Sequence, residues 1–304
     1  MHRFSLGINR MATRLFIGGK FLREKLRVHP IQLSFLLLLF CSLLRINDIF
    51  ILRLDEIWGE IILSKAMGFL LILFTLHWVK VKPSVIGLHT KNIFMNFIIG
   101  AGVFIPVYAL AYGIEYGVLL LSHQNPTIIL SAIDPKQGVS GGLLFGVWLV
   151  FGNGINALME DGLFRGMFLP SFLTKYRFGK ANVFQSLLFG LWHLIWPVKS
   201  FLTGNSSLIG AVMAGLVLFI GTVTSGLIWG YMSYKTDSLW TSVSAHFIAN
   251  TMQNIIHLQS DAGLDVMVAL RGTVASIVGL LSLLFIKWIA DKYKLPQMKP
   301  WPIE

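Results

Sequence analysis

The chain has 304 residues, of which 55% are hydrophobic and only 13% are charged. Soluble domains carry about 25% charged residues, and the apolar residues here fall into long runs, so the composition excludes a soluble protein and indicates an integral membrane protein. The net charge of +11 does not indicate nucleic-acid binding, because Lys and Arg gather near the two termini, where they orient spans and contact anionic lipid headgroups. The single cysteine, Cys41, excludes a disulfide framework and a cysteine-based metal site.

Eight segments are apolar enough to be membrane-spanning helices, since a span needs about 20 mostly apolar residues. In chain order they are residues 31–51, 57–79, 93–121, 141–170, 181–197, 208–232, 238–257 and 266–290. We therefore predict an all-α polytopic membrane protein with about eight transmembrane helices. The fourth segment is long, and we expect it to tilt or to break, either at residues 152–154 or near Gly162.

The positions of Lys and Arg predict the orientation of these spans. With the N-terminus in the cytoplasm, the inner segments hold 18 of these residues and the outer segments hold 4, one of which is Arg45. Because cytoplasmic loops carry the excess of positive charge, both termini are expected inside. Polar residues of the second and third spans (Glu60, Lys65 and Glu115) lie toward span ends, and we expect their side chains to reach water there.

The chain is expected to form one membrane domain with four regions. Residues 1–30 form a basic cytoplasmic N-terminus, and residues 31–140 form the first three transmembrane helices. Residues 141–257 hold helices four to seven, which carry the candidate functional residues, and residues 258–304 form the last helix and a basic cytoplasmic tail.

Four polar residues of spans four, five and seven are predicted to lie at one depth in the membrane. Glu160 is ten residues from the inner end of span four, His193 is twelve residues into span five, and His246 and Asn250 are eight and twelve residues into span seven. With a rise of about 1.5 Å per residue, all four lie roughly 12–18 Å from the cytoplasmic end. An acid inside the bilayer costs several kcal/mol and therefore indicates a functional site.

Helix geometry separates the two neighbouring acids of span four. Asp161 and Arg165 are four residues apart, so they can neutralise each other along one face, and we assign them a structural role. Glu160 points about 100° away from Asp161 and stays outside this pair.

The same spacing of four residues recurs on the two histidine-bearing spans. His246 and Asn250 present an imidazole and an amide on one face, and Phe189 lies one turn from His193, where it can pack against the ring. A carboxylate and two imidazoles at one depth are able to activate water, so hydrolysis inside the bilayer is the function that these residues indicate.

Three ordered motifs in this region resemble those of the CPBP (Abi) intramembrane proteases. This family includes the type II CAAX prenyl endopeptidases and bacterial relatives linked to bacteriocin immunity and peptide processing. The motifs are Glu160-Asp161-x-x-x-Arg165, Phe189-x-x-x-His193 and His246-x-x-x-Asn250. The family pattern has Glu-Glu where this chain has Glu160-Asp161, a difference that keeps the charge and shortens the reach of the second acid.

The resemblance implies an intramembrane endopeptidase in which Glu160 and His193 activate the attacking water. His246 and Asn250 then form an oxyanion hole, or His246 completes a metal site with Glu160 and His193. A His₂Glu set is a known catalytic Zn²⁺ set, whereas a buried glutamate serves as a general base without metal. Asn is a common oxyanion donor and a poor zinc ligand, and the residues leave both mechanisms open.

The resemblance also implies the partners and the location. The substrate is expected to be a membrane-anchored or lipidated peptide or protein, of the CAAX type or of the bacteriocin or signal-peptide type, and the protein is expected in the bacterial cell membrane. Two alternatives come from other classes. A proton-coupled transporter also uses intramembrane Glu and His, but it predicts inverted repeats, which we do not find. A non-catalytic immunity or scaffold protein would keep the fold, but the intact motif residues argue against it.

Overall fold

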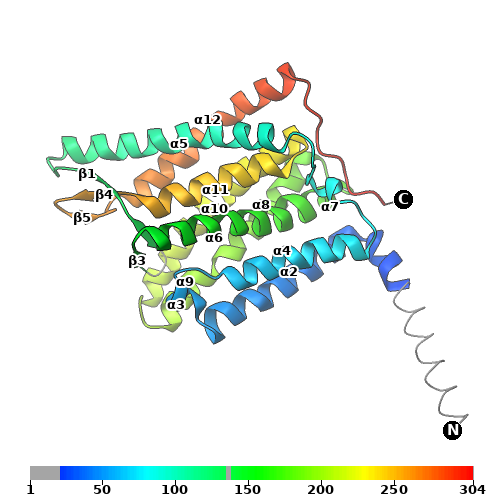
Figure 1. Ribbon diagram of the computed structural model, residues 1–304, viewed down its shortest axis with the longest axis horizontal. Coiled ribbons are helices and arrows are strands. Elements are labelled where there is room, and N and C mark those ends of the chain that lie inside the picture. Colours follow the sequence, from blue (N-terminus) through cyan, green and yellow to red (C-terminus); the bar gives the residue numbers. More distant parts are fainter. Residues whose placement is uncertain (1–20, 135–137, 304) are drawn as a thin grey trace, which may run out of the picture.

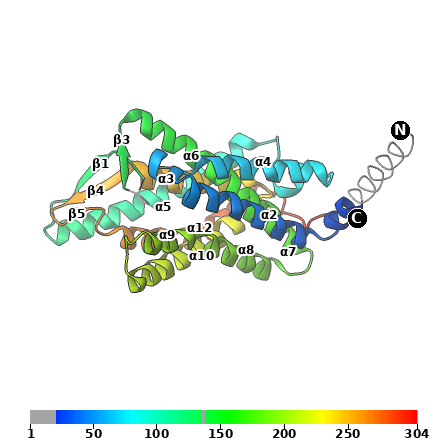
Figure 2. The same cartoon turned by 90° about the horizontal axis from the view of Figure 1, so that it is seen from below.

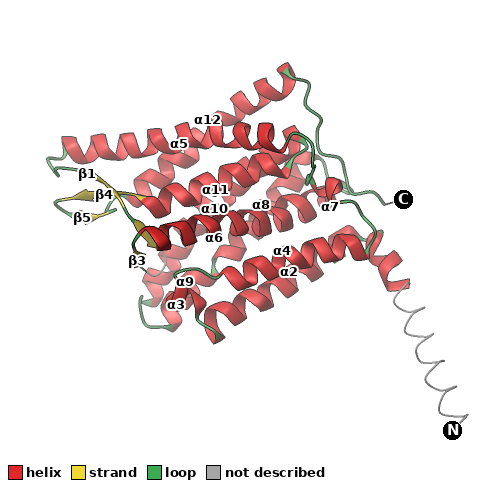
Figure 3. Ribbon diagram, viewed as in Figure 1, coloured by secondary structure: helices red, strands yellow, loops and turns green. Residues whose placement is uncertain are grey.

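The computed structural model describes residues 21–134 and 138–303, so most of the basic N-terminal region predicted for residues 1–30 lies outside the described residues. In the described part, long helices run alongside one another (Figure 1). The predicted all-α class is confirmed, apart from short strands at one end of the helices (Figure 3).

Helices occupy all eight ranges that the sequence predicts to be apolar spans. They are α2 (Pro30–Ile46) with the π-helix η1 (Asn47–Ile51), α4 (Ile62–Trp78), α5 (Ile93–Leu121), α6 (Leu143–Asp161) with the π-helix η3 (Gly162–Phe168) and α7 (Leu169–Leu173), α8 (Phe178–His193), α10 (Leu208–Thr236), α11 (Leu239–Ile255) and α12 (Val268–Lys292). Within the described ranges, five segments are long and apolar enough to cross a membrane: Pro30–Ile51, Ile93–Leu121, Leu143–Leu173, Leu208–Thr236 and Val268–Lys292. The remaining helices α4, α8 and α11 are shorter, with 17, 16 and 17 residues.

Two predicted spans are interrupted in the structure. The second was expected over residues 57–79, but a separate short helix, α3 (Leu54–Trp58), precedes α4. Gly59 lies between them with φ 67°, a left-handed conformation that ends a helix and that glycine adopts without strain. The fifth was expected over residues 181–197, but α8 ends at His193, and Pro197 lies in the first turn of the next helix, α9 (Ile195–Leu202), where its missing N–H is tolerated.

Close packing between helices positions the middle of the bundle. α8 lies against α10, and α11 lies against α5, α6 and α10; Figure 2 shows α8 and α10 at one edge of the molecule and α4 and α6 at the opposite edge. Gly226 and Gly230 face α8, and a Cβ at Gly230 would lie 1.9 Å from Oδ1 of Asn182. These small residues, spaced by four, allow the two backbones to approach as in other membrane helix pairs.

The strands lie just beyond the end of α11. β1 (Thr127–Leu130) pairs antiparallel with β4 (Ile256–Ser260), with Thr127 opposite Gln259, and β4 also pairs with β5 (Gly263–Leu264). β2 (Ala132–Asp134) pairs with β3 (Val139–Gly141). This pairing ends the seventh helix at Ile255, two residues before the predicted end of the span, and it places His257 in a strand.

A buried charged cluster stabilises this end of the helices. The expectation that Glu115 reaches water is wrong: its side chain is buried, and Arg271 donates to its two carboxylate oxygens at 2.5 and 3.0 Å. Asp265 links Arg271 to His257, whose Nδ1 lies 2.6 Å from Oδ2 of Asp265. The hydrogen bond with Asp265 raises the pKa of His257. Burial alone would raise the pKa of Asp265, but hydrogen bonds from His257 and Arg271 outweigh it and hold that pKa at about 2.

Candidate active site

Three of the four residues predicted at one depth meet in the structure. Glu160 at the end of α6, His193 at the end of α8 and His246 in the middle of α11 lie together. The Nε2 atoms of His193 and His246 lie 3.8 and 3.7 Å from the same oxygen, Oε2 of Glu160. Glu160 and His246 are only 3% and 2% exposed, whereas the His193 side chain is 16% exposed. The site is therefore accessible to solvent on the side of His193.

The partners of the two imidazoles fix how each ring faces Glu160. Nδ1 of His193 lies 2.8 Å from the backbone oxygen of Phe189, and Nδ1 of His246 lies 3.2 Å from Oδ2 of Asp161. A carbonyl or carboxylate oxygen accepts hydrogen bonds only, so Nδ1 of each neutral ring carries the proton. The lone pairs on both Nε2 atoms are therefore directed at Glu160.

Three hydrogen-bond acceptors thus converge on one small volume. Oε2 of Glu160 is buried, and the residues that the structure describes offer it no hydrogen-bond donor. A carboxylate oxygen and two imidazole lone pairs repel one another electrostatically at this separation, and a group that donates protons between them relieves the repulsion. Such an arrangement is suited to take a proton from water.

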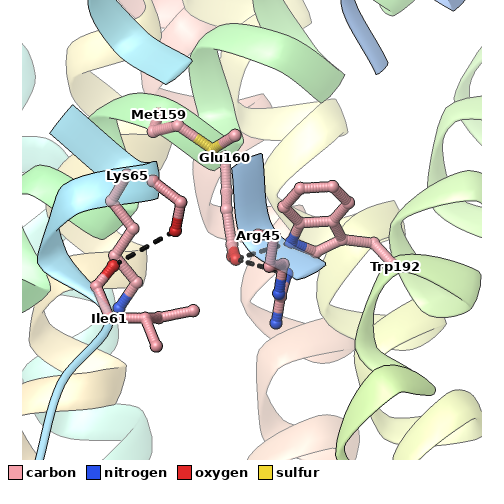
Figure 4. A pocket seen from close by; sticks show the side chains of 7 residues that line it. Arg45, Ile61, Lys65, Met159, Glu160 and Trp192 are labelled. Atoms are coloured by element: carbon pink, nitrogen blue, oxygen red, sulfur yellow. Dashed lines mark hydrogen bonds and ion pairs between the residues drawn. The ribbon is translucent and has the colours of Figure 1, made fainter. Parts of the chain in front are cut away.

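The other carboxylate oxygen of Glu160 is held by two residues outside the predicted set. The indole Nε1 of Trp192 donates to Oε1 at 2.8 Å, and Nη1 of Arg45 lies 3.5 Å from the same oxygen (Figure 4). Arg45 was counted as an outer residue of the first span, but it is only 4% exposed. The signals in the sequence were a cation within an apolar segment and a tryptophan directly before His193.

Asp161 has a second partner besides the one predicted for it. The expected pair forms within the helix, with Nε of Arg165 3.2 Å from Oδ1 of Asp161, and both side chains are fully buried. The other oxygen of Asp161 contacts His246. Asp161 therefore orients an imidazole of the site as well as neutralising Arg165, in the way that carboxylates orient histidines elsewhere.

Aromatic rings enclose the histidines. Phe189 packs edge-on against His193, with centroids 4.6 Å apart, which agrees with the spacing of one helical turn. Trp229 of α10 stacks on His246 at 4.2 Å, a contact that no local pattern in the sequence indicates. The guanidinium of Arg165 lies over both rings, 4.0 Å from the centroid of Phe189 and 5.2 Å from that of Trp229. These contacts exclude water and fix the rings.

Asn250 lies one turn beyond His246 on α11, as the spacing predicts. It is half-buried, and its amide has no hydrogen-bond partner in residues 21–134 and 138–303. The structure therefore leaves an amide donor uncommitted next to His246, without a contact to Glu160.

The helix that carries both acids changes its winding directly after them. α6 runs without a break through residues 152–154, and the π-helix η3 begins at Gly162. The second of the two expected positions is thus where the irregularity occurs. A π-helix is rare and is often found at functional sites, and a second one, η1, begins two residues after Arg45.

The structure gives the metal alternative no support. The described residues contain no group of three or more His, Cys, Asp or Glu that could hold a metal ion. The Zn²⁺ ligand set of Glu160, His193 and His246 therefore stays an unsupported prediction.

The region that holds these side chains matches a known family. Residues 142–252 match the type II CAAX prenyl endopeptidase Rce1-like family. The match confirms the resemblance to the CPBP/CAAX proteases, and it covers Glu160, His193, His246 and Asn250. The family supports a protease, and the apolar helices support an integral membrane protein. Neither the curated proteins nor the solved structures give a significant match.

Proposed function

We propose that the protein is an intramembrane endopeptidase that hydrolyses a peptide bond of a membrane-associated peptide or protein. The observation that carries the proposal is the convergence of both histidine Nε2 atoms on the unbonded oxygen of Glu160. The match to type II CAAX prenyl endopeptidases supports the reaction class. A non-catalytic scaffold would have no need for a buried carboxylate arranged in this way, since burying it costs stability.

The proposed reaction uses water as the nucleophile. Oε2 of Glu160, assisted by Nε2 of His193, takes a proton from a water molecule, and the water oxygen adds to the carbonyl carbon of the scissile bond. The resulting oxyanion accepts hydrogen bonds from the amide of Asn250 and from Nε2 of His246, which takes up a proton from solvent before the water adds and returns it to solvent after the products leave. The proton held by Glu160 then passes to the leaving nitrogen, and the carbon–nitrogen bond breaks.

The proposed substrate is anchored in the membrane or carries a lipid. The site lies among apolar helices, and of Glu160, His193 and His246 it is His193 whose side chain is partly exposed. We propose a CAAX-type substrate or a bacteriocin or signal-peptide type substrate, because both bring a peptide bond to the bilayer without a folded domain that must enter.

We also propose that all eight long helical segments cross the membrane of a bacterial cell, with both termini in the cytoplasm. Three single-cysteine variants in a Cys41→Ser background test this orientation: Lys175→Cys and Lys235→Cys are expected to label only from the cytoplasm, and Gln124→Cys only from outside. Cys41 is fully buried, and it is replaced so that the label can react only with the introduced cysteine. Labelling of Lys175→Cys from outside would contradict the orientation.

A membrane proteome comparison tests the proposed activity and identifies the substrate in the same experiment. Cells that express the wild type are expected to contain a processed membrane peptide that is missing with Glu160→Ala at equal protein abundance. The same purified proteins in proteoliposomes, tested for cleavage of that peptide and for proton-coupled uptake, separate a protease from a transporter. Uptake without cleavage would contradict the proposal.

A further inference from the structure

Arg45 enters the site from a part of the chain that the family match does not cover. It lies near the end of α2, whereas the match begins at residue 142. Its guanidinium lies 4.3 Å from the centroid of the Trp192 ring and 3.5 Å from Oε1 of Glu160. Trp192 donates to the same oxygen, so a cation and an indole together fix one side of the carboxylate.

The two oxygens of Glu160 consequently have different surroundings. Oε1 accepts from Trp192 and faces Arg45, while Oε2 faces the two histidines and has no donor among the described residues. Fixing Oε1 sets the rotation of the carboxylate, and this rotation directs Oε2 at the histidines.

The space on the Arg45 side of Glu160 is too small for a substrate. A cavity of about 10 Å³ lies there, lined by Arg45, Lys65, Glu160 and Trp192 together with Ile61, Ser64 and Met159 (Figure 4). This is near the lower limit for a single water molecule. Arg45 therefore has no room to contact a peptide in this cavity, and it acts on the reaction through Glu160.

Other charges around Glu160 are already paired. Lys65, which also lines the cavity, forms an ion pair with Glu60, and Arg165 is paired with Asp161. The groups that face or flank Glu160 are Arg45 from α2, Lys65 from α4, His193 from α8, His246 from α11, and Asp161 and Arg165 from its own helix and η3. Among these cations, Arg45 is the one whose ion pair is with Glu160.

We propose that Arg45 is a positioning residue: together with Trp192 it holds Oε1 of Glu160, and this contact turns Oε2 toward His193 and His246. The inference rests on the proposed function for its consequence in catalysis, but the pairing itself does not require activity. This ion pair gives the N-terminal helices a role in the site, because α2 supplies the positive charge that lies next to Glu160 of α6.

An infrared titration of Glu160 tests the pairing directly. The carboxyl band is obtained by subtracting the Glu160→Gln spectrum from the wild type, and by subtracting Arg45→Gln/Glu160→Gln from Arg45→Gln. Loss of the guanidinium is expected to move protonation of Glu160 to higher pH by roughly 1–3 units, the size of a carboxylate–arginine effect. Arg45→Lys keeps the charge and is expected to restore most of the difference. An unchanged titration in Arg45→Gln would overturn the proposal.

A matched control removes a buried arginine elsewhere. Arg271→Gln breaks the ion pair with Glu115 at the far end of the helices, and it is expected to leave the Glu160 titration unchanged. An equal shift in this variant would overturn the proposal. If Arg45→Gln gives no folded protein, recovery of folding in Arg45→Gln/Glu160→Gln supports the pairing, and failure of the double variant assigns Arg45 to packing.

Activity provides a second readout. The acid limb of kcat/KM is expected to move to higher pH in Arg45→Gln by the same amount as the infrared titration, because Glu160 must be ionised to accept a proton. If the wild type cleaves no membrane peptide, the proposed function fails, and the infrared result still decides whether Arg45 positions Glu160.

Discussion

Glu160→Gln is expected to abolish peptide hydrolysis by the purified protein, with a loss of at least about 10³-fold in kcat, since it removes a general base whose contribution is typically 10²–10⁴-fold and also the site of the negative charge. The amide keeps the size of the side chain, and its oxygen can still accept from Trp192, which donates to Oε1 in the wild type. Folding should therefore be preserved, while Oε2 is replaced by a group that donates and cannot take a proton.

The measurement is initial-rate cleavage of the identified membrane peptide, with the amount of folded protein determined by size-exclusion chromatography. Glu24→Gln is the matched control: the same chemical change is made at an exposed residue outside the site, and wild-type rates are expected. Cleavage by Glu160→Gln at the wild-type rate would show that another group activates the water.

The candidate site was predictable where the inference depends only on the geometry of individual helices. Shared depth in three spans selected Glu160, His193 and His246, and the structure brings them together. Spacing of four residues predicted the contact between Phe189 and His193 and the ion pair of Asp161. Both kinds of inference depend only on helix rise and turn, which are the same in every helix.

The contacts of the site that were missed join side chains from different helices. Arg45 and Glu160 are 115 residues apart, and Trp229 reaches His246 from another helix. No local spacing encodes which faces of two helices meet, because this depends on packing across the whole bundle.

The errors for polar residues near span ends have two causes, a local pair for Glu60 and Lys65 and a long-range pair for Glu115. Glu60, Lys65 and Glu115 were expected to reach water, and all three are buried. Glu60 pairs with Lys65 at a bend that begins at Gly59, and Glu115 pairs with Arg271 on α12. A buried charge is tolerated in a membrane protein when a partner compensates it, and the partner of Glu115 is on a helix that the sequence does not place beside α5.

The eight apolar ranges were predicted well, but their ends were not. The structure ends α8 four residues before the predicted end of that span and places strands after α11. Hydropathy averages over a window and therefore locates the middle of a helix better than its boundary. The strands need backbone pairing between residues 127–130 and 256–260, which is again a long-range contact.

Arg165→Ala is expected to destabilise the fold by about 3–5 kcal/mol, because it leaves Asp161 as an uncompensated charge in a fully buried position. None of the guanidinium nitrogens of Arg165 has a hydrogen-bond partner among the described residues, so the ion pair with Asp161 and the rings of Phe189 and Trp229 are what hold it. The loss is measured as the midpoint of unfolding in detergent, with Arg53→Ala, at an exposed arginine, as the control.

The double variant Asp161→Asn/Arg165→Met separates two roles of Asp161. Neither charge remains, and methionine fills the space against the aromatic rings, so most of the stability is expected to return, as when a buried ion pair is replaced by apolar residues. Hydrolysis is not expected to return with it, because the asparagine amide lacks the carboxylate charge that orients Nδ1 of His246. Stability equal to that of Arg165→Ala alone would show that the ion pair is not what the fold depends on at this position.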